Sequence, residues 1–265
     1  MRSVLSTLVG TALAMSLMAV APAEVEAISC GSFSRAFAGT VETHTGAVLG
    51  ASSRIEYVNE ALCTPLPGGQ GSFSSYWVAV VGNHPNDTVG RNIFQIGVDK
   101  CQGSACPAGV PVNDSYYFYA YGRMASSACG NAVDPMPVMA PKGLASAGKP
   151  LYSIFRQSIP GAGIFYVAKI SGSQQTMRSA SSLETCWSGV DSAQLLNEVA
   201  MPGDQLGGPD DQRQNWEDPL WRNGSVWQAI TRQPNSQCDV EERSSDRCRW
   251  SASGDPVWWS WDTRY

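Results

Sequence analysis

The chain has 265 residues, of which 15% are charged and 43% are hydrophobic, and its formal net charge is −5. Soluble domains contain about 25% charged residues, so this chain is sparsely charged. A sequence pI of about 5.0, without any basic stripe, argues against binding to a phosphate backbone, and we expect no nucleic-acid partner.

The N-terminal segment has the pattern of an export signal. Arg2 supplies the positive start, residues 4–20 are apolar, and small residues follow, with possible cleavage after Ala23 or Ala27. An uncleaved anchor is the alternative, but the apolar core is short for a membrane span. We therefore expect residues 1–27 to be a signal peptide and the mature protein to be secreted, extracellular and free of the membrane.

All eight cysteines lie beyond this signal. An even number of cysteines in an exported chain predicts disulfides, and two local pairs are plausible, Cys101–Cys106 and Cys238–Cys248. The other pairings are open. A metal site is not expected because there is no paired CxxC motif, and only His44 and His84 could add nitrogen ligands. Both histidines are predicted to be surface loop residues, and no cofactor is expected.

Short apolar or β-branched runs separated by glycine- and proline-rich joints recur along the chain. They are predicted to be strands at 40–45, 54–58, 76–81, 93–98, 115–122, 151–157, 163–171, 183–190 and 193–199. Residues 151–157 and 163–171 are expected to form a hairpin. Residues 131–149 carry several prolines and are expected to be an extended loop rather than a helix.

These elements predict an all-β fold, an antiparallel β-sandwich stabilised by disulfides. No sustained helical period appears, although residues 193–200 and 238–249 could form single helical turns. We expect the sandwich domain to span residues 28–212. Residues 213–265 are expected to be a tryptophan-rich extension packed on or beside it.

The tryptophan-rich tail has two interpretations. Aromatic rings can stack on sugar faces, and exported sandwiches often bind carbohydrate. Alternatively, Trp258, Trp259 and Trp261 cover the edge of the sandwich or pack into its core, which we favour.

Two polar residues interrupt apolar segments and are the candidates for catalysis. Gln95 lies inside the run 93–98, where a buried amide must either bond the backbone or act as a donor in a cleft. Glu198 is the acidic residue of the apolar segment 193–199. A carboxylate beside an apolar wall has a raised pKa and can serve as general base and then general acid. An amide nearby can donate to a developing oxyanion.

The commonest catalytic motifs are absent from the chain. There is no GxSxG, no P-loop, no GxGxxG after a strand and no HExxH. A pair formed by an amide and a carboxylate is sufficient in principle to add water to a peptide bond without a metal or a nucleophilic side chain.

The segment from Trp77-Val78 to Phe94-Gln95-Ile96-Gly97-Val98-Asp99 resembles the glutamic peptidases of the eqolisin type, which carry a WVGID segment followed by an LQTGFD-like strand. The tyrosine run 116–121 occupies the place of that family's aromatic strand, and residues 193–198 look like its AEFIIE segment. The resemblance implies a sandwich of two curved antiparallel sheets, like a lectin jelly-roll.

The resemblance also implies a catalytic dyad of Gln95 and Glu198. Residues expected to bind substrate are Trp77, Asp99, Tyr119 and Tyr121. The sequence departs from the family at Val81 and Ala120, where the family has acidic residues, and the loop before Gln95 is longer.

We therefore expect a secreted glutamic-peptidase-like hydrolase that acts on peptide bonds at acid pH, with a protein or polysaccharide substrate and a monomeric state. Whether the protein is an enzyme is open from sequence. The alternatives are a non-catalytic sandwich that binds carbohydrate or a cell surface, and a purely structural secreted protein.

Overall fold

A computed structural model describes the chain between residues 30 and 264. It leaves undescribed residues 33, 45, 57, 59, 65–70, 84–91, 107–114, 124–137, 141–148, 172–175, 179–188, 209–210, 231–239, 242, 244 and 252–256. His84, Cys129, Cys186, Cys238 and most of the proline-rich segment 131–149 therefore lie outside the described residues.

The described chain consists of two antiparallel sheets, so the predicted all-β sandwich is confirmed. The first sheet has seven strands in the order β13-β1-β10-β3-β4-β5-β6. Their bounds are β1 (Ala36–Thr43), β3 (Ser72–Asn83), β4 (Asn92–Gln102), β5 (Ser115–Arg123), β6 (Val138–Ala140), β10 (Gly189–Val199) and β13 (Val240–Glu241). A single 3-10 turn, η1 (Gly103–Ala105), follows β4.

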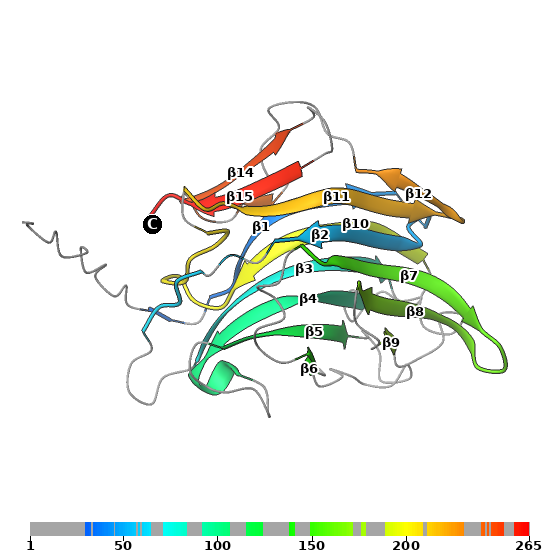
Figure 1. The fold of residues 1–265 in the computed structure, drawn as a ribbon, viewed down its shortest axis with the longest axis horizontal. Helices are drawn as coiled ribbons and strands as arrows, with labels where there is room; N and C mark the ends of the chain where they lie inside the picture. Colours follow the sequence, from blue (N-terminus) through cyan, green and yellow to red (C-terminus); the bar gives the residue numbers. More distant parts are fainter. Residues whose placement is uncertain are drawn as a thin grey trace, which may run out of the picture.

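The second sheet has eight strands, seven in the order β14-β15-β11-β2-β7-β8-β9 and β12 paired with β11. Their bounds are β2 (Gly50–Ile55), β7 (Leu151–Ile159), β8 (Gly163–Ile170), β9 (Thr176–Arg178), β11 (Gln214–Asn223), β12 (Val226–Ala229), β14 (Asp246–Ser251) and β15 (Val257–Asp262). The strands of both sheets bend along their length (Figure 1). The predicted hairpin is β7–β8.

The helical turns considered at 193–200 and 238–249 do not form in the described residues. Residues 193–199 belong to β10, and the described part of 238–249 lies in or beside β13 and β14. The segment AQLLNEV contains β-branched and leucine side chains that fit either structure. Its pairing with strands on both sides selects the extended form.

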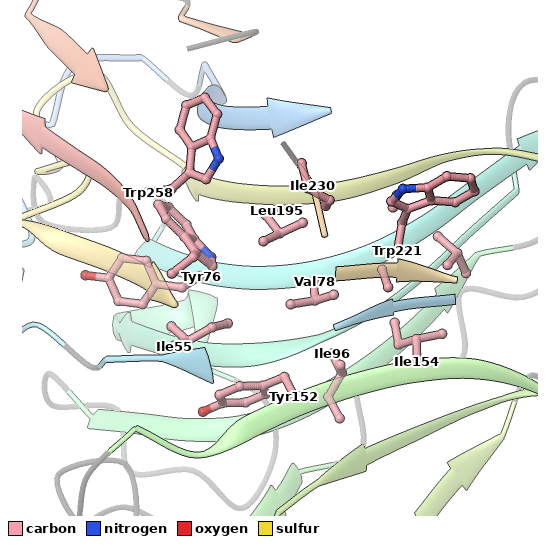
Figure 2. Packing of buried hydrophobic residues seen from close by; sticks show 14 of the residues in the cluster. Ile55, Tyr76, Val78, Ile96, Tyr152, Ile154, Leu195, Trp221, Ile230 and Trp258 are labelled. Carbon is pink, nitrogen blue, oxygen red and sulfur yellow. The ribbon is translucent and has the colours of Figure 1, made fainter. Parts of the chain in front are cut away.

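The main core lies between the two sheets. Side chains on one face of β3, such as Tyr76 and Val78, meet Tyr152 and Ile154 of β7 (Figure 2). Trp216, Trp221 and Trp258 from the tryptophan-rich tail are buried in the same cluster. Of the three rings named in the packing interpretation, Trp258 is buried and Trp259 and Trp261 are partly buried. Within the tail, β11, β12, β14 and β15 belong to the second sheet and β13 belongs to the first.

The opposite face of the first sheet is also covered by apolar side chains. Trp77, Ala79, Val81 and Leu196 are buried there in a second cluster with partly buried neighbours such as Phe37. Sheets buried on both faces carry near-continuous apolar runs instead of an alternating pattern. This explains why 76–81 and 93–98 read as uninterrupted hydrophobic segments.

Two disulfides are described. Cys101–Cys106 is the predicted local pair, and Cys30–Cys63 closes a loop with a sequence separation of 33 residues. In the chain-entropy account a loop of this length stabilises the fold by about 4 kcal/mol. Cys248 is also disulfide-bonded, and its partner lies outside the described residues. No helix among the described residues is long and apolar enough to cross a membrane.

A buried carboxyl ties one end of the two sheets together. Glu60 is almost fully buried, and its Oε1 accepts hydrogen bonds from Asn197 Nδ2 at 3.0 Å and from the backbone N–H groups of Gly207 and Gly208. Those two glycines have φ of +87° and +80°, a conformation that favours glycine. Lys100 Nζ donates to the backbone carbonyl of Glu60.

Burial raises the pKa of Glu60 to about 8, against the hydrogen bonds that favour its ionised form. Burial also raises the pKa of Asp204, which accepts hydrogen bonds from Ser72, Cys63 and Met201. The folded protein therefore holds protons that the unfolded chain releases near the ordinary carboxyl pKa. Between that value and about pH 8, a rise in pH favours unfolding.

We expect the melting temperature to fall as the pH rises from about 5 to about 8. Glu60→Gln keeps the acceptor oxygen and cannot ionise, so it should flatten this dependence. Thermal unfolding followed by circular dichroism across the pH range measures both. Asp211→Asn, at an exposed position, is the matched control and should retain the wild-type slope. A wild-type protein that is more stable at pH 8 than at pH 5 would contradict this assignment.

Candidate functional site

The register of three neighbouring strands, β10, β3 and β4, brings the candidate residues to one sheet face. Residues directly opposite each other in antiparallel strands point to the same side. The three rows across β10, β3 and β4 are Glu198–Ser75–Asp99, Leu196–Trp77–Gly97 and Gln194–Ala79–Gln95. Their neighbours in β3, such as Tyr76 and Val78, point into the main core. Glu198, Trp77, Asp99 and Gln95 thus share the face of the first sheet that is turned away from the core.

Glu198 is held by a cation and an indole. Arg35 Nη1 donates to Glu198 Oε1 at 2.8 Å, and Trp77 Nε1 lies 3.3 Å from Oε2. The side chain of Glu198 is 7% exposed, whereas that of Arg35 is 54% exposed. The guanidinium places a positive charge directly beside the carboxyl group. Trp77 thus lies beside Glu198 as an apolar ring that also supplies a hydrogen-bond donor.

Sequence reasoning missed Arg35. It lies just before β1, and Ala36 pairs with Val199, which brings the guanidinium beside Glu198 across 163 positions of sequence. Only the pairing of β1 with β10 reveals this contact. In the sequence, a single arginine before a short strand does not indicate contact with a distant glutamate.

Gln95 is 8% exposed and lies opposite the small side chain of Ala79. Relative to Glu198 it is two strands across and four residues along. On a flat sheet this offset separates the Cα atoms by about 16 Å, from about 10 Å across and about 13 Å along. The row of Leu196, Trp77 and Gly97 lies between the amide and the carboxylate, and a water with a substrate group would have to bridge the two.

Gly97 occupies the middle of this arrangement. It lies between Gln95 and Asp99 along β4 and pairs with Trp77 of β3. Because glycine has no side chain, Gly97 adds no side-chain atoms to the row between Glu198 and Gln95. A Cβ atom built on Gly97 would lie 2.0 Å from the backbone oxygen of Tyr76 and 2.9 Å from Trp77 Cα. Strand β3 approaches too closely for any larger residue.

The other predicted substrate-binding residues lie in neighbouring positions. Asp99 is buried in the row of Glu198, with Ser75 between the two carboxylates. The backbone of Tyr119 pairs with Gly97 and that of Tyr121 pairs with Gln95. The side chains of β5 lie outside the described part of the structure, so their contacts stay predictions.

No group of histidine, cysteine, aspartate or glutamate residues suited to a metal ion occurs among the described residues. His44 is half-exposed, as expected for a surface residue, but it is not isolated. Its ring stacks on Trp221 with centroids 3.8 Å apart, and its Nε2 lies 2.6 Å from Glu42 Oε1.

No protein-family model and no curated protein matches the chain. Among solved structures, it is similar to scytalido-glutamic peptidase bound to a transition-state analogue inhibitor, with 11% identity, and to the same peptidase with a peptide-based analogue, with 13% identity. Each match covers 87% of this chain and 100% of the other, with a TM-score of 0.46.

A third match is SCP-B, a member of the eqolisin family of peptidases, in a complex with the tripeptide Ala-Ile-His. The identity is 11%, the TM-score is 0.45, and 88% of this chain and 100% of the other are covered. At these values the relationship is a distant likeness of fold, and any function has to be argued from the residues of the site.

We expect Gly97→Ala to lower the melting temperature, because the added Cβ meets strand backbone that cannot move without shifting β3. Overpacking of this kind costs about 1–3 kcal/mol. Gly46→Ala is the control, since no atom lies within 4 Å of a Cβ there and only its φ of +68° is unfavourable. Thermal unfolding compares the two. Equal stability of the two variants would show that the close approach of β3 and β4 is wrong.

Proposed function

We propose that the protein is a secreted hydrolase that cleaves peptide bonds at acid pH through Glu198 and Gln95. The observation that carries the proposal is the common register of β10, β3 and β4, which puts both side chains on one face around the row of Trp77 and Gly97. Glu198 is buried, forms an ion pair and accepts a hydrogen bond from an indole, and these properties together distinguish it from an ordinary surface glutamate.

In this mechanism the ionised Glu198 carboxylate takes a proton from a water molecule. The water oxygen attacks the carbonyl carbon of the substrate, and the carbonyl oxygen gains negative charge. The Gln95 amide donates an N–H to that oxygen. Glu198 then returns the proton to the leaving nitrogen as the carbon–nitrogen bond breaks, so one carboxyl serves first as base and then as acid.

The surrounding residues have separate roles. Arg35 and Trp77 hold Glu198 in one orientation, because they engage its two oxygens separately. Asp99 contributes negative charge beside Ser75 on the same face, and Tyr119 and Tyr121 would contact the substrate from β5. The low exposure of this face strengthens each electrostatic interaction.

Wild-type protein is expected to digest a denatured protein substrate at acid pH and to resist pepstatin and metal chelators. Glu198→Gln should abolish the digestion because an amide cannot accept the proton. Gln95→Ala should lower kcat by about 10²–10³, the usual effect of removing one oxyanion donor. Release of peptides from denatured haemoglobin measures the rates, with Glu42→Gln as an active control. Undiminished digestion by Glu198→Gln would eliminate the mechanism.

Arg35→Gln is expected to leave some activity and to move the acid limb of the pH–rate profile to higher pH. The physical reason is that Glu198 loses the cation that stabilises its ionised, base-competent form. Initial rates between about pH 2 and pH 7 give the profile. Arg249→Gln, an exposed arginine on β14, is the control for loss of one positive charge. An unchanged acid limb would show that Arg35 does not act on Glu198.

A further inference from the structure

A groove of about 520 Å³ lies on the second sheet, on the face turned away from the core. Ser153 and Phe155 of β7 line it, whereas Ile154 between them is buried in the core. Ser52, Leu220, Arg222 and Trp227 complete most of the lining. Its size falls within the range of small-ligand sites, about 300–1,000 Å³. It is on a different sheet from Glu198 and Gln95.

One wall of the groove is an exposed tryptophan. Trp227 lies on the short strand β12, whose residues are all exposed, and it is 36% exposed itself. Val226 and Trp227 are the large hydrophobic side chains exposed among the described residues, whereas Trp216, Trp221 and Trp258 are buried. An aromatic ring left open beside a groove offers a flat apolar surface, and an indole also keeps a polar N–H.

A cation lies next to this ring, and a second cation lies beside the neighbouring Phe155. The Arg222 guanidinium carbon is 5.8 Å from the Trp227 ring centroid and 5.9 Å from that of Phe155. Lys169 Nζ is 5.3 Å from the Phe155 centroid. Among the described residues, neither Arg222 nor Lys169 has an ion-pair partner, and Arg222 Nε has no hydrogen-bond partner.

Two other cations near this sheet are paired. Arg54 contacts Asp218 at 3.3 Å, and Lys149 contacts Glu56 at 3.0 Å and also Glu217. The groove is thus a local cationic site on a chain whose net charge is −5. Charge complementarity selects an anionic ligand.

Hydroxyl groups form the floor. Ser52 Oγ donates to the backbone oxygen of Tyr152 at 3.0 Å, and the Oγ atoms of Ser52 and Ser153 are 3.0 Å apart. Because Ser52 uses its proton on the backbone, Ser153 donates to Ser52 and keeps lone pairs that can accept from a ligand hydroxyl. The groove therefore combines an aromatic face, cations and hydroxyl acceptors.

We propose that this groove binds an acidic saccharide of the hexuronate type. The sugar ring lies against Trp227, its carboxylate lies at Arg222, and a ring hydroxyl donates to Ser153, while Lys169 beside Phe155 adds positive charge nearby. A neutral sugar leaves the two cations unused. An acidic peptide has no row of hydroxyls for the serine floor.

The test is isothermal titration of the full chain with a soluble oligogalacturonate, and with the same oligomer after methyl esterification. The esterified form keeps the sugar rings and hydroxyls but removes the charge. We expect the acid to bind and the ester to bind at least about tenfold more weakly. Arg222→Gln and Trp227→Ala are each expected to weaken binding of the acid about tenfold.

Arg249→Gln and Val226→Ala are the matched controls, because they change an exposed cation and an exposed apolar side chain outside the lining. Both should bind as wild type does. If Arg222→Gln does not fold, Lys169→Gln, at an exposed position, tests whether binding of the acid needs positive charge at this site. Glu198→Gln should keep full saccharide affinity, so failure of the proposed peptidase activity and failure of this site are separate results.

Several results would overturn the proposal. They are equal affinity for the acid and the ester, wild-type affinity in Trp227→Ala, and no binding at millimolar saccharide. A poly-glutamate peptide that binds as tightly as the oligogalacturonate and loses affinity in the same variants would also overturn it, in favour of an acidic peptide ligand.

Discussion

The candidate active site depends on the antiparallel register of β10, β3 and β4. The side-chain period of a strand is two, so a slip of one residue in either pairing would carry Glu198 or Gln95 to the opposite face and into the main core. Apolar side chains on both faces of β3 resist such a slip, because Val78 and Trp77 each lie in a buried cluster. The register that packs the sheet is therefore also the register that assembles the site.

Two buried carboxyl groups make the stability of this sandwich depend on pH. Glu60 and Asp204 lie where the chain joins one sheet to the other, and burial raises the pKa of both. Arg243 and Arg264 hold the same end by contacts to Asp262 and to the backbone oxygen of Asp204. Burial of these two carboxyl groups therefore makes the fold lose stability as the pH rises.

The two outer faces of the sandwich have different chemistry. The first sheet presents a buried carboxylate, an amide and an indole around Gly97, whereas the second presents an exposed indole, two cations and serine hydroxyls. The main core separates them, so neither site needs the other to form. Under the two proposals, the protein holds an acidic polysaccharide on one face and acts on peptides at the other.

The sequence alone determined the all-β sandwich, the hairpin of β7 and β8, the Cys101–Cys106 disulfide, and the choice of Gln95 and Glu198 as polar residues within apolar strands. These are local properties, since they follow from side-chain type and short spacing. The tertiary structure decided which strands are neighbours. Only that pairing brings Arg35 to Glu198, Glu60 to Asn197 and Arg222 to Trp227, because contacts between strands distant in sequence leave no local pattern in either one.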